Sequence, residues 1–449
     1  MHEFDEETNA LASKIFEYAQ SRTRLDPIPL NFPKTEQELD ELCGETITRD
    51  GIGGMTALEL FTDVLEPASL SVDYTKYLSF VPAAPTESAV LFDLVVGAAS
   101  IYAGSWLEGA GAIYAENAAL NWLRRISGMP DGSGGVFVPG GTVGNLSALV
   151  AARHEAVLRL GEDRPARFAM IASKESHSSI NAAALVMDCD VILCDTDEHR
   201  RMTGDAVAAL LDEHGDRIFA VVTTSGTTNL GIIDELRSIG ELCRDRNVWM
   251  HVDGAYGGAG LASERTHNLF DGLEFADSFI VDPHKWLFAP FDCCALLYRE
   301  PARAVDAHAQ HAGYLSFLDI YGDKNPSDYA VHLTRRARGL PFWFSLATHG
   351  TQAYEEAIDA TLDLTDAAAE MIRAADHLEL AHEPNLSVVA FRRIGWDAAE
   401  YQAWSEKMMN EGIAFVTPSR LDGEPIYRFA FVNPRTTTDE IAEIIEALE

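Results

Sequence analysis

The fold is decided by two stretches of the sequence, Val248-Trp-Met-His-Val-Asp253-Gly-Ala-Tyr256 and Ser278-Phe-Ile-Val-Asp282-Pro-His-Lys-Trp286. Each begins as a short apolar run and ends in charged or small residues, as a strand does where it enters a loop. Similar runs start at Val136, Phe168, Asp190, Phe219 and Cys294, and helical patterns separate several of them. Strands that alternate with helices predict an α/β fold with a mainly parallel, seven-stranded sheet flanked by helices.

The segments outside this region are mostly helical. Thr35-Glu-Gln-Glu38 is a capping box that predicts the start of a helix, and apolar helices are expected from about Glu87 to Ser100 and from Tyr114 to Ile126. A long helix from about Pro341 to Ala375 leads into a smaller mixed unit. We therefore expect three parts: an N-terminal helical segment (1–78), a large α/β domain (79–345) and a small C-terminal α+β domain (346–449).

Composition excludes several classes of function. The 449 residues carry a net charge of −36, which disfavours binding to nucleic acid or to an anionic membrane surface. The longest apolar stretch, Ser88 to Trp106, contains Asp93 and is patterned like a buried helix and not like a membrane span. The six cysteines show no Cys-x-x-Cys spacing and the N-terminus is acidic, so we expect no metal site and a cytoplasmic protein.

The residues just after the strands are the candidates for a binding site, because ligands in such folds bind at the carboxyl ends of the strands. The first strand is followed by Pro139-Gly-Gly-Thr-Val-Gly-Asn145, a glycine-rich turn at a helix start that could hold an anion. It lacks the spacing of a Walker loop or of a dinucleotide fingerprint. The ends of other strands lead into His177, the hydroxyl-rich turn Thr223–Thr228, Asp253 and Lys285.

Together these strand ends meet the demands of pyridoxal phosphate. That cofactor requires an amine for a Schiff base, a carboxylate for its pyridine nitrogen, a flat group against its ring and an anion cradle. Lys285 supplies the amine, Asp253 the carboxylate, His177 the flat group, and Gly141 with Thr142 the cradle. Each feature alone has a structural explanation, such as a capping or core role for His177, so the hypothesis depends on the whole set.

Elimination favours Lys285 among the seven lysines. Lys174 is its competitor, since it also follows a strand, but it lies in a polar turn beside His177. The neighbours of Lys285 are apolar, and we expect them to lower its pKa and expose a nucleophilic amine.

At this point a family resemblance can be stated. Asp253-Gly-Ala-Tyr, followed 32 positions after the aspartate by the lysine of Pro-His-Lys-Trp, resembles the pyridoxal-phosphate-dependent group II decarboxylases. These include the aromatic-L-amino-acid, glutamate, histidine and diaminobutyrate decarboxylases. The resemblance extends from Phe80-Val-Pro-Ala-Ala-Pro-Thr to Phe431-Val-Asn-Pro-Arg-Thr. It implies a type I aminotransferase-like fold and a homodimer with active sites at the interface, the N-terminal segment wrapping the partner.

The resemblance also implies a role for individual residues. Lys285 forms the Schiff base, Asp253 pairs with the pyridinium, and His177 stacks on the ring and helps to orient the substrate carboxylate. The remaining cofactor contacts it implies are Gly141, Thr142 and His284 at the phosphate, Thr228 near the ring and Ala255 beneath it.

A tyrosine before the segment Thr334-Arg-Arg-Ala-Arg338 is expected to return the proton to the substrate, because the family uses a loop tyrosine there. Tyr329 is the best match, with Tyr321 and Tyr314 as alternatives. An arginine of the segment could instead be a solvated charge. One departure from the family is Asp282, since many members have asparagine before Pro-His-Lys.

The expected reaction is decarboxylation of an L-amino acid to a primary amine and CO₂. The segment Tyr77–Pro85 resembles the wall of the family's substrate pocket. Phe80 and Trp106 would favour an apolar or aromatic side chain, although both could be core residues. Decarboxylation of an acidic or diamino acid, and a decarboxylation-dependent aldehyde synthase, stay open. A dinucleotide-dependent oxidoreductase or a cofactor-free homologue would leave Asp253 and Lys285 unexplained.

Overall fold

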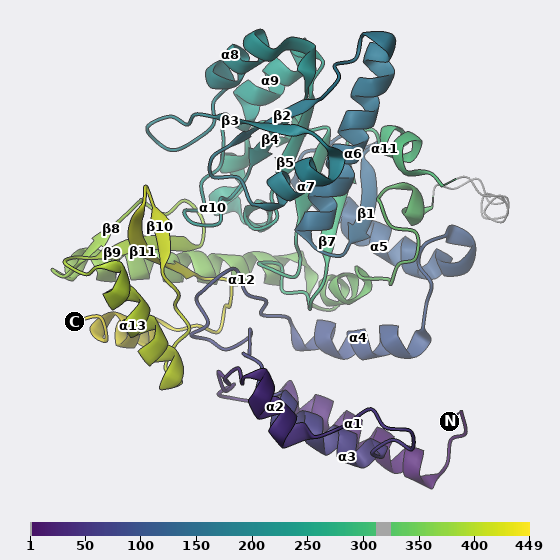
Figure 1. Cartoon of the computed structure of the whole chain (residues 1–449), viewed down its shortest axis with the longest axis vertical. Coiled ribbons are helices and arrows are strands. Elements are labelled where there is room, and N and C mark those ends of the chain that lie inside the picture. The colour runs from purple at the N-terminus through teal and green to yellow at the C-terminus, as the bar shows by residue number, and fades with distance from the viewer. Residues whose placement is uncertain (1, 311–324) are drawn as a thin grey trace.

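The computed structural model describes residues 2–310 and 325–449 and places three helices at the N-terminus apart from the rest (Figure 1). They are α1 (Glu6–Arg22), α2 (Glu36–Cys43) and α3 (Gly54–Leu60), and a π-helical turn over Phe61–Leu65 follows α3. The capping box predicted at Thr35 is confirmed, because Thr35 and Glu38 each accept a hydrogen bond from the other's backbone N–H. None of the residues in these three helices is buried.

The central sheet has seven strands in the order β1-β7-β6-β5-β4-β2-β3, which confirms the predicted α/β fold. Among these strands β7 runs antiparallel to both of its neighbours, while β2, β3, β4, β5 and β6 pair in parallel. Every residue of β4, β5, β6 and β7 is buried. The strands are β1 (Gly134–Val138), β2 (Ala169–Ser173), β3 (Asp190–Cys194), β4 (Ile218–Thr224), β5 (Trp249–Asp253), β6 (Ser278–Val281) and β7 (Cys294–Tyr298).

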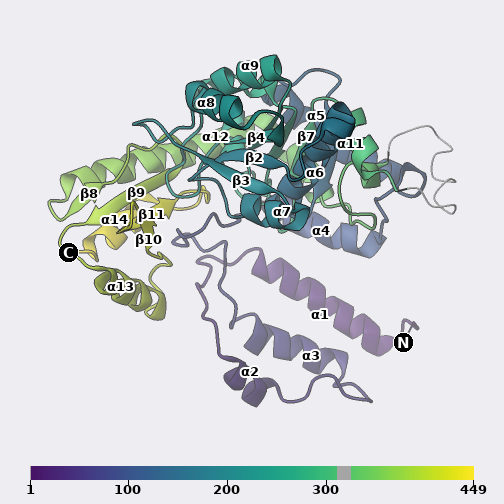
Figure 2. The same ribbon diagram turned by 45° about the horizontal axis from the view of Figure 1, so that its top comes forward.

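Helices cover both faces of this sheet (Figure 2). One core cluster joins the strands to α5 (Trp106–Ile126), α8 (Gly204–His214), α9 (Leu236–Arg246) and α12 (Leu340–Ala374). A second joins them to α6 (Gly141–Leu160), α7 (Ser179–Met187) and α11 (Pro301–His308), and the short α10 (Glu264–His267) packs near the first.

Helix α4 (Glu87–Ala99) differs from the expectation of a buried helix. In the single chain only Ala89 and Val96 of α4 are buried, and Leu94 and Val95 are 42% and 53% exposed. The chain itself therefore leaves most of α4 uncovered, because apolar composition does not tell whether a helix is covered by its own chain. No helix among the described residues is long and apolar enough to cross a membrane.

The C-terminal part carries an antiparallel sheet in the order β10-β11-β9-β8, with α12 running from the central sheet towards it (Figure 1). Aromatic residues such as Phe391, Tyr401 and Tyr427 fill the core between this sheet and its helices. The elements are β8 (Leu378–Leu380), β9 (Val388–Arg393), α13 (Ala398–Asn410), β10 (Ser419–Leu421), β11 (Glu424–Ala430) and α14 (Thr438–Glu446).

Candidate active site

The strand ends of the central sheet surround one cavity of about 300 Å³. It is lined by residues that follow β1, β2, β4, β5 and β6, which is the edge of the sheet where the sequence placed a ligand site. All eight residues predicted to contact the cofactor line it: Gly141, Thr142, His177, Thr228, Asp253, Ala255, His284 and Lys285.

The glycine-rich turn forms one wall of the cavity and leads into α6. Its Gly140 has φ +82°, a left-handed conformation that favours glycine, and no side chain caps the start of the helix. A Cβ on Gly141 would lie 3.0 Å from Asp282 Oδ2, so only a residue without a side chain fits there comfortably. Uncapped backbone N–H groups and the helix dipole make this end of α6 suitable for an anionic group.

Asp253 ends β5 and is buried, with 6% of its surface exposed. Asn145 Nδ2 donates to its Oδ2 at 2.8 Å, and the backbone N–H of Ala255 donates to its Oδ1 at 3.1 Å. These two donors stabilise the carboxylate as an anion inside the protein, where an unpaired charge would be costly.

Lys285 follows β6 and contacts a second acid. Its Nζ lies 3.1 Å from Asp282 Oδ2, and His284 Nε2 lies 3.7 Å from the same oxygen. Burial alone lowers the pKa of Lys285, but the charges of Asp282 and Asp253 outweigh burial, and the pKa is raised above its ordinary value. The expectation of a lowered pKa is therefore wrong in the cofactor-free protein, because an acid three residues before the lysine faces it.

Asp282 itself is almost fully buried, and its Oδ1 has no hydrogen-bond partner among the described residues. The sequence had singled out this residue as a departure from the family. The structure places its carboxylate between the start of α6 and the amine of Lys285.

His177 precedes α7, and its ring is oriented by Ser179. Nδ1 of His177 accepts from the backbone N–H of Ser179 at 3.2 Å and lies 2.9 Å from the Ser179 hydroxyl. A nitrogen that accepts from a backbone N–H carries no proton, so the ring proton is on Nε2.

Lys174, the competing lysine, lies outside this cavity. Its side chain is exposed, and its Nζ is paired with Asp195 Oδ1 at 2.6 Å. The ion pair with Asp195 raises the pKa of Lys174. Because Lys174 lies outside the cavity, Lys285 is the amine that lines it.

Three other predicted residues do not line the cavity of their own chain: Tyr329, Phe80 and Trp106. Tyr329 packs against the core cluster that includes α6 and α7, and its carbonyl accepts from the Tyr298 hydroxyl. Phe80 is 58% exposed, and Trp106 begins α5. Tyr314 and Tyr321 lie outside the described residues.

The first arginine of the Arg-Arg-x-Arg segment is not a solvated charge. Arg335 is buried and forms a two-pronged ion pair with Glu116 of α5, at 2.8 and 2.9 Å. It also donates to the backbone carbonyls of Ala103 and Phe137. Its neighbour Arg336 is exposed and pairs with Asp93, and the partly buried Arg338 pairs with Asp292. The alternative of a solvated arginine therefore fits Arg336 best.

The sequence interpretation missed three residues of the site: Asn145, His251 and Glu175. Asn145 and Glu175 line the cavity, and His251 contacts Asn145 from β5. One signal was available, because side chains two apart in a strand share a face, which places His251 beside Asp253.

Comparisons with known proteins give matches in both sequence and fold. The family model described as the pyridoxal-dependent decarboxylase conserved domain matches residues 62–394. An aromatic-L-amino-acid decarboxylase of Bacillus atrophaeus is 31% identical over 83% of this chain and 80% of its own length. An L-2,4-diaminobutyrate decarboxylase of Rhizobium meliloti (strain 1021) is 34% identical over 88% and 80%. The crystal structure of Oryza sativa TDC with PLP and tryptamine superposes with a TM-score of 0.92, at 22% identity over 100% of this chain and 98% of that one.

Proposed function

The chain belongs to the pyridoxal-dependent decarboxylases, and from this membership we propose that it converts an aromatic L-amino acid to its primary amine and CO₂. Membership of the family means that the protein is a pyridoxal-phosphate-dependent amino-acid decarboxylase. Its substrate and the roles of its residues are what we propose here. The observation that carries the roles is that Lys285, Asp253, His177 and the glycine-rich turn line one cavity.

The residues present fit the cofactor. The start of α6 offers uncapped N–H groups for a phosphate, Asp253 offers a buried carboxylate, and Lys285 offers an amine. When bound, pyridoxal phosphate supplies an electron-poor ring that accepts the electron pair released as the carboxylate leaves.

The protein's own groups then have separate tasks. Asp253, held by two donors, would face the ring nitrogen and favour its protonated form, and Lys285 would hold the cofactor through its Nζ. His177 presents Nε2–H as a donor for the substrate carboxylate. Tyr329 remains the proposed source of the proton delivered to the substrate Cα, a role that a second subunit or a loop movement must complete, since it lies away from this cavity.

Phe80 supports an aromatic substrate. It has φ +55°, an unfavourable conformation for a large side chain, and its carbonyl accepts from Arg428 Nη1 at 2.6 Å. A large aromatic ring that is both exposed and held in a strained conformation is suited to contact a ligand or a second subunit. We propose that Phe80 contacts the substrate side chain across the interface of a dimer.

An acidic substrate is disfavoured by the charges at the cavity. Asp253, Asp282 and Glu175 line it, and no arginine among the described residues does. A second carboxylate on the substrate would therefore meet like charges without a guanidinium to bind it.

Glu175 favours a second candidate, a diamino acid such as L-2,4-diaminobutyrate. It lines the cavity two residues before His177, and its carboxylate is 3.9 Å from the nearest cation, Arg200 Nη1. A carboxylate with so distant a partner could bind the side-chain ammonium of a diamino substrate.

Incubation of the enzyme and cofactor with separate amino acids, with amines measured by mass spectrometry, tests the proposal. We expect amine from an aromatic acid and none from glutamate. Phe80→Ala should raise KM for the aromatic L-amino acid, whereas Glu175→Gln should leave that KM within twofold of the wild-type value. Turnover of diaminobutyrate alone, with KM raised roughly tenfold or more by Glu175→Gln, would replace the aromatic proposal with the second candidate.

We further propose that the chain forms a homodimer. The N-terminal helices expose large apolar residues that their own chain does not cover, and α4 exposes Leu94 and Val95. These exposed apolar residues include Phe4, Phe16, Leu42, Phe61 and Leu65. Light scattering should give twice the 49.1 kDa chain mass, and a monomer mass at micromolar concentration would contradict the dimer.

The three-part division into 1–78, 79–345 and 346–449 and the cytoplasmic location also remain proposals. All six cysteines are free and five of them are buried, which supports a reducing compartment.

A further inference from the structure

A buried amide connects two groups of the site. Asn145 lies in the first turns of α6 and is 1% exposed. Its Nδ2 donates to Asp253 Oδ2 at 2.8 Å and to Ser179 Oγ at 2.9 Å. Ser179 in turn contacts His177 Nδ1 through its hydroxyl and its backbone N–H. One side-chain amide thus reaches both Asp253 and, through Ser179, His177.

The orientation of this amide follows from the carboxylate. An ionised Asp253 only accepts hydrogen bonds, so the side of Asn145 that faces it must be the NH₂ group. The carbonyl Oδ1 then faces His251 Nε2, 2.8 Å away, and that nitrogen must carry a proton. Because the second N–H of Asn145 is donated to Ser179, the Ser179 hydroxyl is free to donate to His177 Nδ1.

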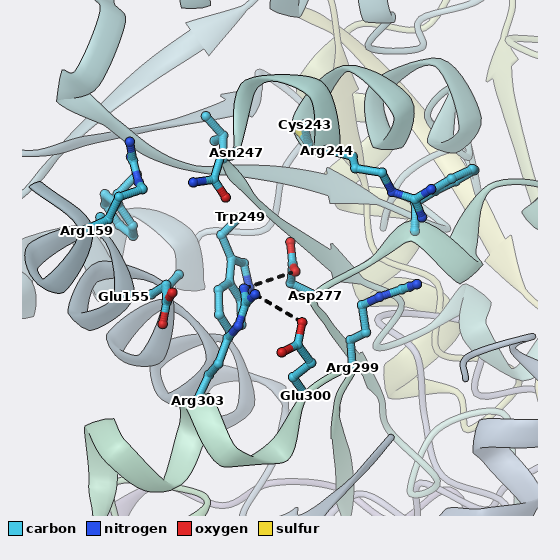
Figure 3. A pocket seen from close by; sticks show the side chains of 15 residues that line it. Glu155, Arg159, Cys243, Arg244, Asn247, Trp249, Asp277, Arg299, Glu300 and Arg303 are labelled. Atoms are coloured by element: carbon cyan, nitrogen blue, oxygen red, sulfur yellow. Dashed lines mark ion pairs between the residues drawn. The ribbon is translucent and has the colours of Figure 1, made fainter. Parts of the chain in front are cut away.

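The hydrogen bonds on the other side of His251 also place its proton on Nε2. His251 is completely buried, and burial lowers its pKa to about 4, so its ring carries a single proton. With that proton on Nε2, Nδ1 accepts from Ser278 Oγ at 2.8 Å, and Ser278 accepts from Trp249 Nε1 at 2.8 Å. Trp249 lines a separate cavity of about 220 Å³ among several arginines, as Figure 3 shows.

We propose that Asn145 is a positioning residue that sets Asp253 and His177 together for the cofactor, with His251 holding the amide in the required orientation. This inference rests on the proposed role of the cavity as the cofactor site. Donation from Asn145 fixes the direction of the Asp253 carboxylate, and the contacts of Ser179 with Nδ1 hold the His177 ring with its proton on Nε2. Among the described residues no other side chain hydrogen-bonds to Asp253.

Three variants test the proposal in the full-length protein titrated with pyridoxal phosphate. Asn145→Ala should weaken cofactor binding roughly tenfold or more, because Asp253 loses its side-chain donor. Ser179→Ala removes the hydroxyl that joins Asn145 to His177 but keeps the hydrogen bond from Asn145 to Asp253. It should therefore leave the cofactor dissociation constant within about twofold while raising KM for the amino acid. Asn433→Ala is the control: Asn433 is also buried, makes two hydrogen bonds and lies outside the cavity.

Cofactor affinity is measured by quenching of intrinsic fluorescence, and thermal melting of the cofactor-free proteins reports folding. The proposal is supported if Asn145→Ala binds the cofactor much more weakly than the control at a similar melting temperature. It is overturned if Asn145→Ala and Asn433→Ala bind the cofactor equally well. If Asn145→Ala does not fold, a Ser179→Ala variant with unchanged KM overturns it instead. Wild-type protein that binds no cofactor would refute the proposed function and not this inference alone.

Discussion

The buried pair of Arg335 and Glu116 provides a quantitative test of the structure. Arg335→Met removes a guanidinium that makes two hydrogen bonds to Glu116 and two to the backbone carbonyls of Ala103 and Phe137. Phe137 lies in β1, two residues before the glycine-rich turn. The ion pair and its backbone contacts therefore join the segment Thr334–Arg338 to the wall of the cavity.

The expected cost is large because Glu116 would keep its charge in the interior. Glu116 retains one other donor, the backbone N–H of Gly339 at 2.8 Å. Breaking a buried pair by removing one partner typically costs about 3–5 kcal/mol, whereas an exposed pair contributes about 1 kcal/mol or less. The neighbouring Arg336, paired with Asp93 at the surface, is therefore a matched control.

Urea unfolding at fixed protein and cofactor concentrations measures the difference. Arg335→Met should lower the free energy of unfolding by several kcal/mol, and Arg336→Met should change it by less than about 1 kcal/mol. The double variant Glu116→Leu/Arg335→Met should be more stable than Arg335→Met alone, because it leaves no unpaired charge. Equal effects of the two single variants would refute the buried pair.

Three further predictions concern the cavity and the proposed proton donor. Asp282→Asn removes the nearest carboxylate to Lys285 and so lowers its pKa; cofactor incorporation, followed by absorbance, should reach half its maximal rate at a lower pH, and an unchanged midpoint would contradict this. Gly141→Ala places a Cβ 3.0 Å from Asp282 Oδ2 and should weaken cofactor binding several-fold by fluorescence titration; wild-type affinity would show that the turn does not touch the cofactor. Tyr329→Phe should still bind cofactor but, in air-saturated buffer, divert product from amine to aldehyde and ammonia, with dioxygen as the oxidant reduced to hydrogen peroxide. An unchanged amine yield under dioxygen would exclude Tyr329 as the proton donor.

Much of the fold was predictable because buried strands leave a strong pattern. The apolar runs that lead into Asp253 and Lys285 form the neighbouring parallel strands β5 and β6, and this pairing brings the two residues to one cavity. The antiparallel direction of β7 was not predictable, since the apolar run from Cys294 does not indicate in which direction the strand runs beside its neighbours. The strands β8 and β10 have three residues each and are too short to show a period.

The parts of the site that sequence did not predict depend on contacts between distant segments. In the sequence Asn145 is an ordinary polar residue of a predicted helix. Only the packing of α6 against β5 places its Nδ2 2.8 Å from Asp253 Oδ2. The raised pKa of Lys285 depends on Asp282, and the sequence showed that spacing but not the direction of the side chain. Phe80 and Trp106 were assigned from the family resemblance, and one chain alone does not bring them to the cavity.

Reduction of the cofactor-loaded protein with borohydride, followed by peptide mass mapping, tests most directly whether this cavity holds the cofactor. The reduced pyridoxyl group should be found on the peptide that contains Lys285, and Lys285→Ala protein should yield no labelled peptide. A stoichiometric label on Lys174, or on any lysine outside the cavity, would contradict the assignment of the active site.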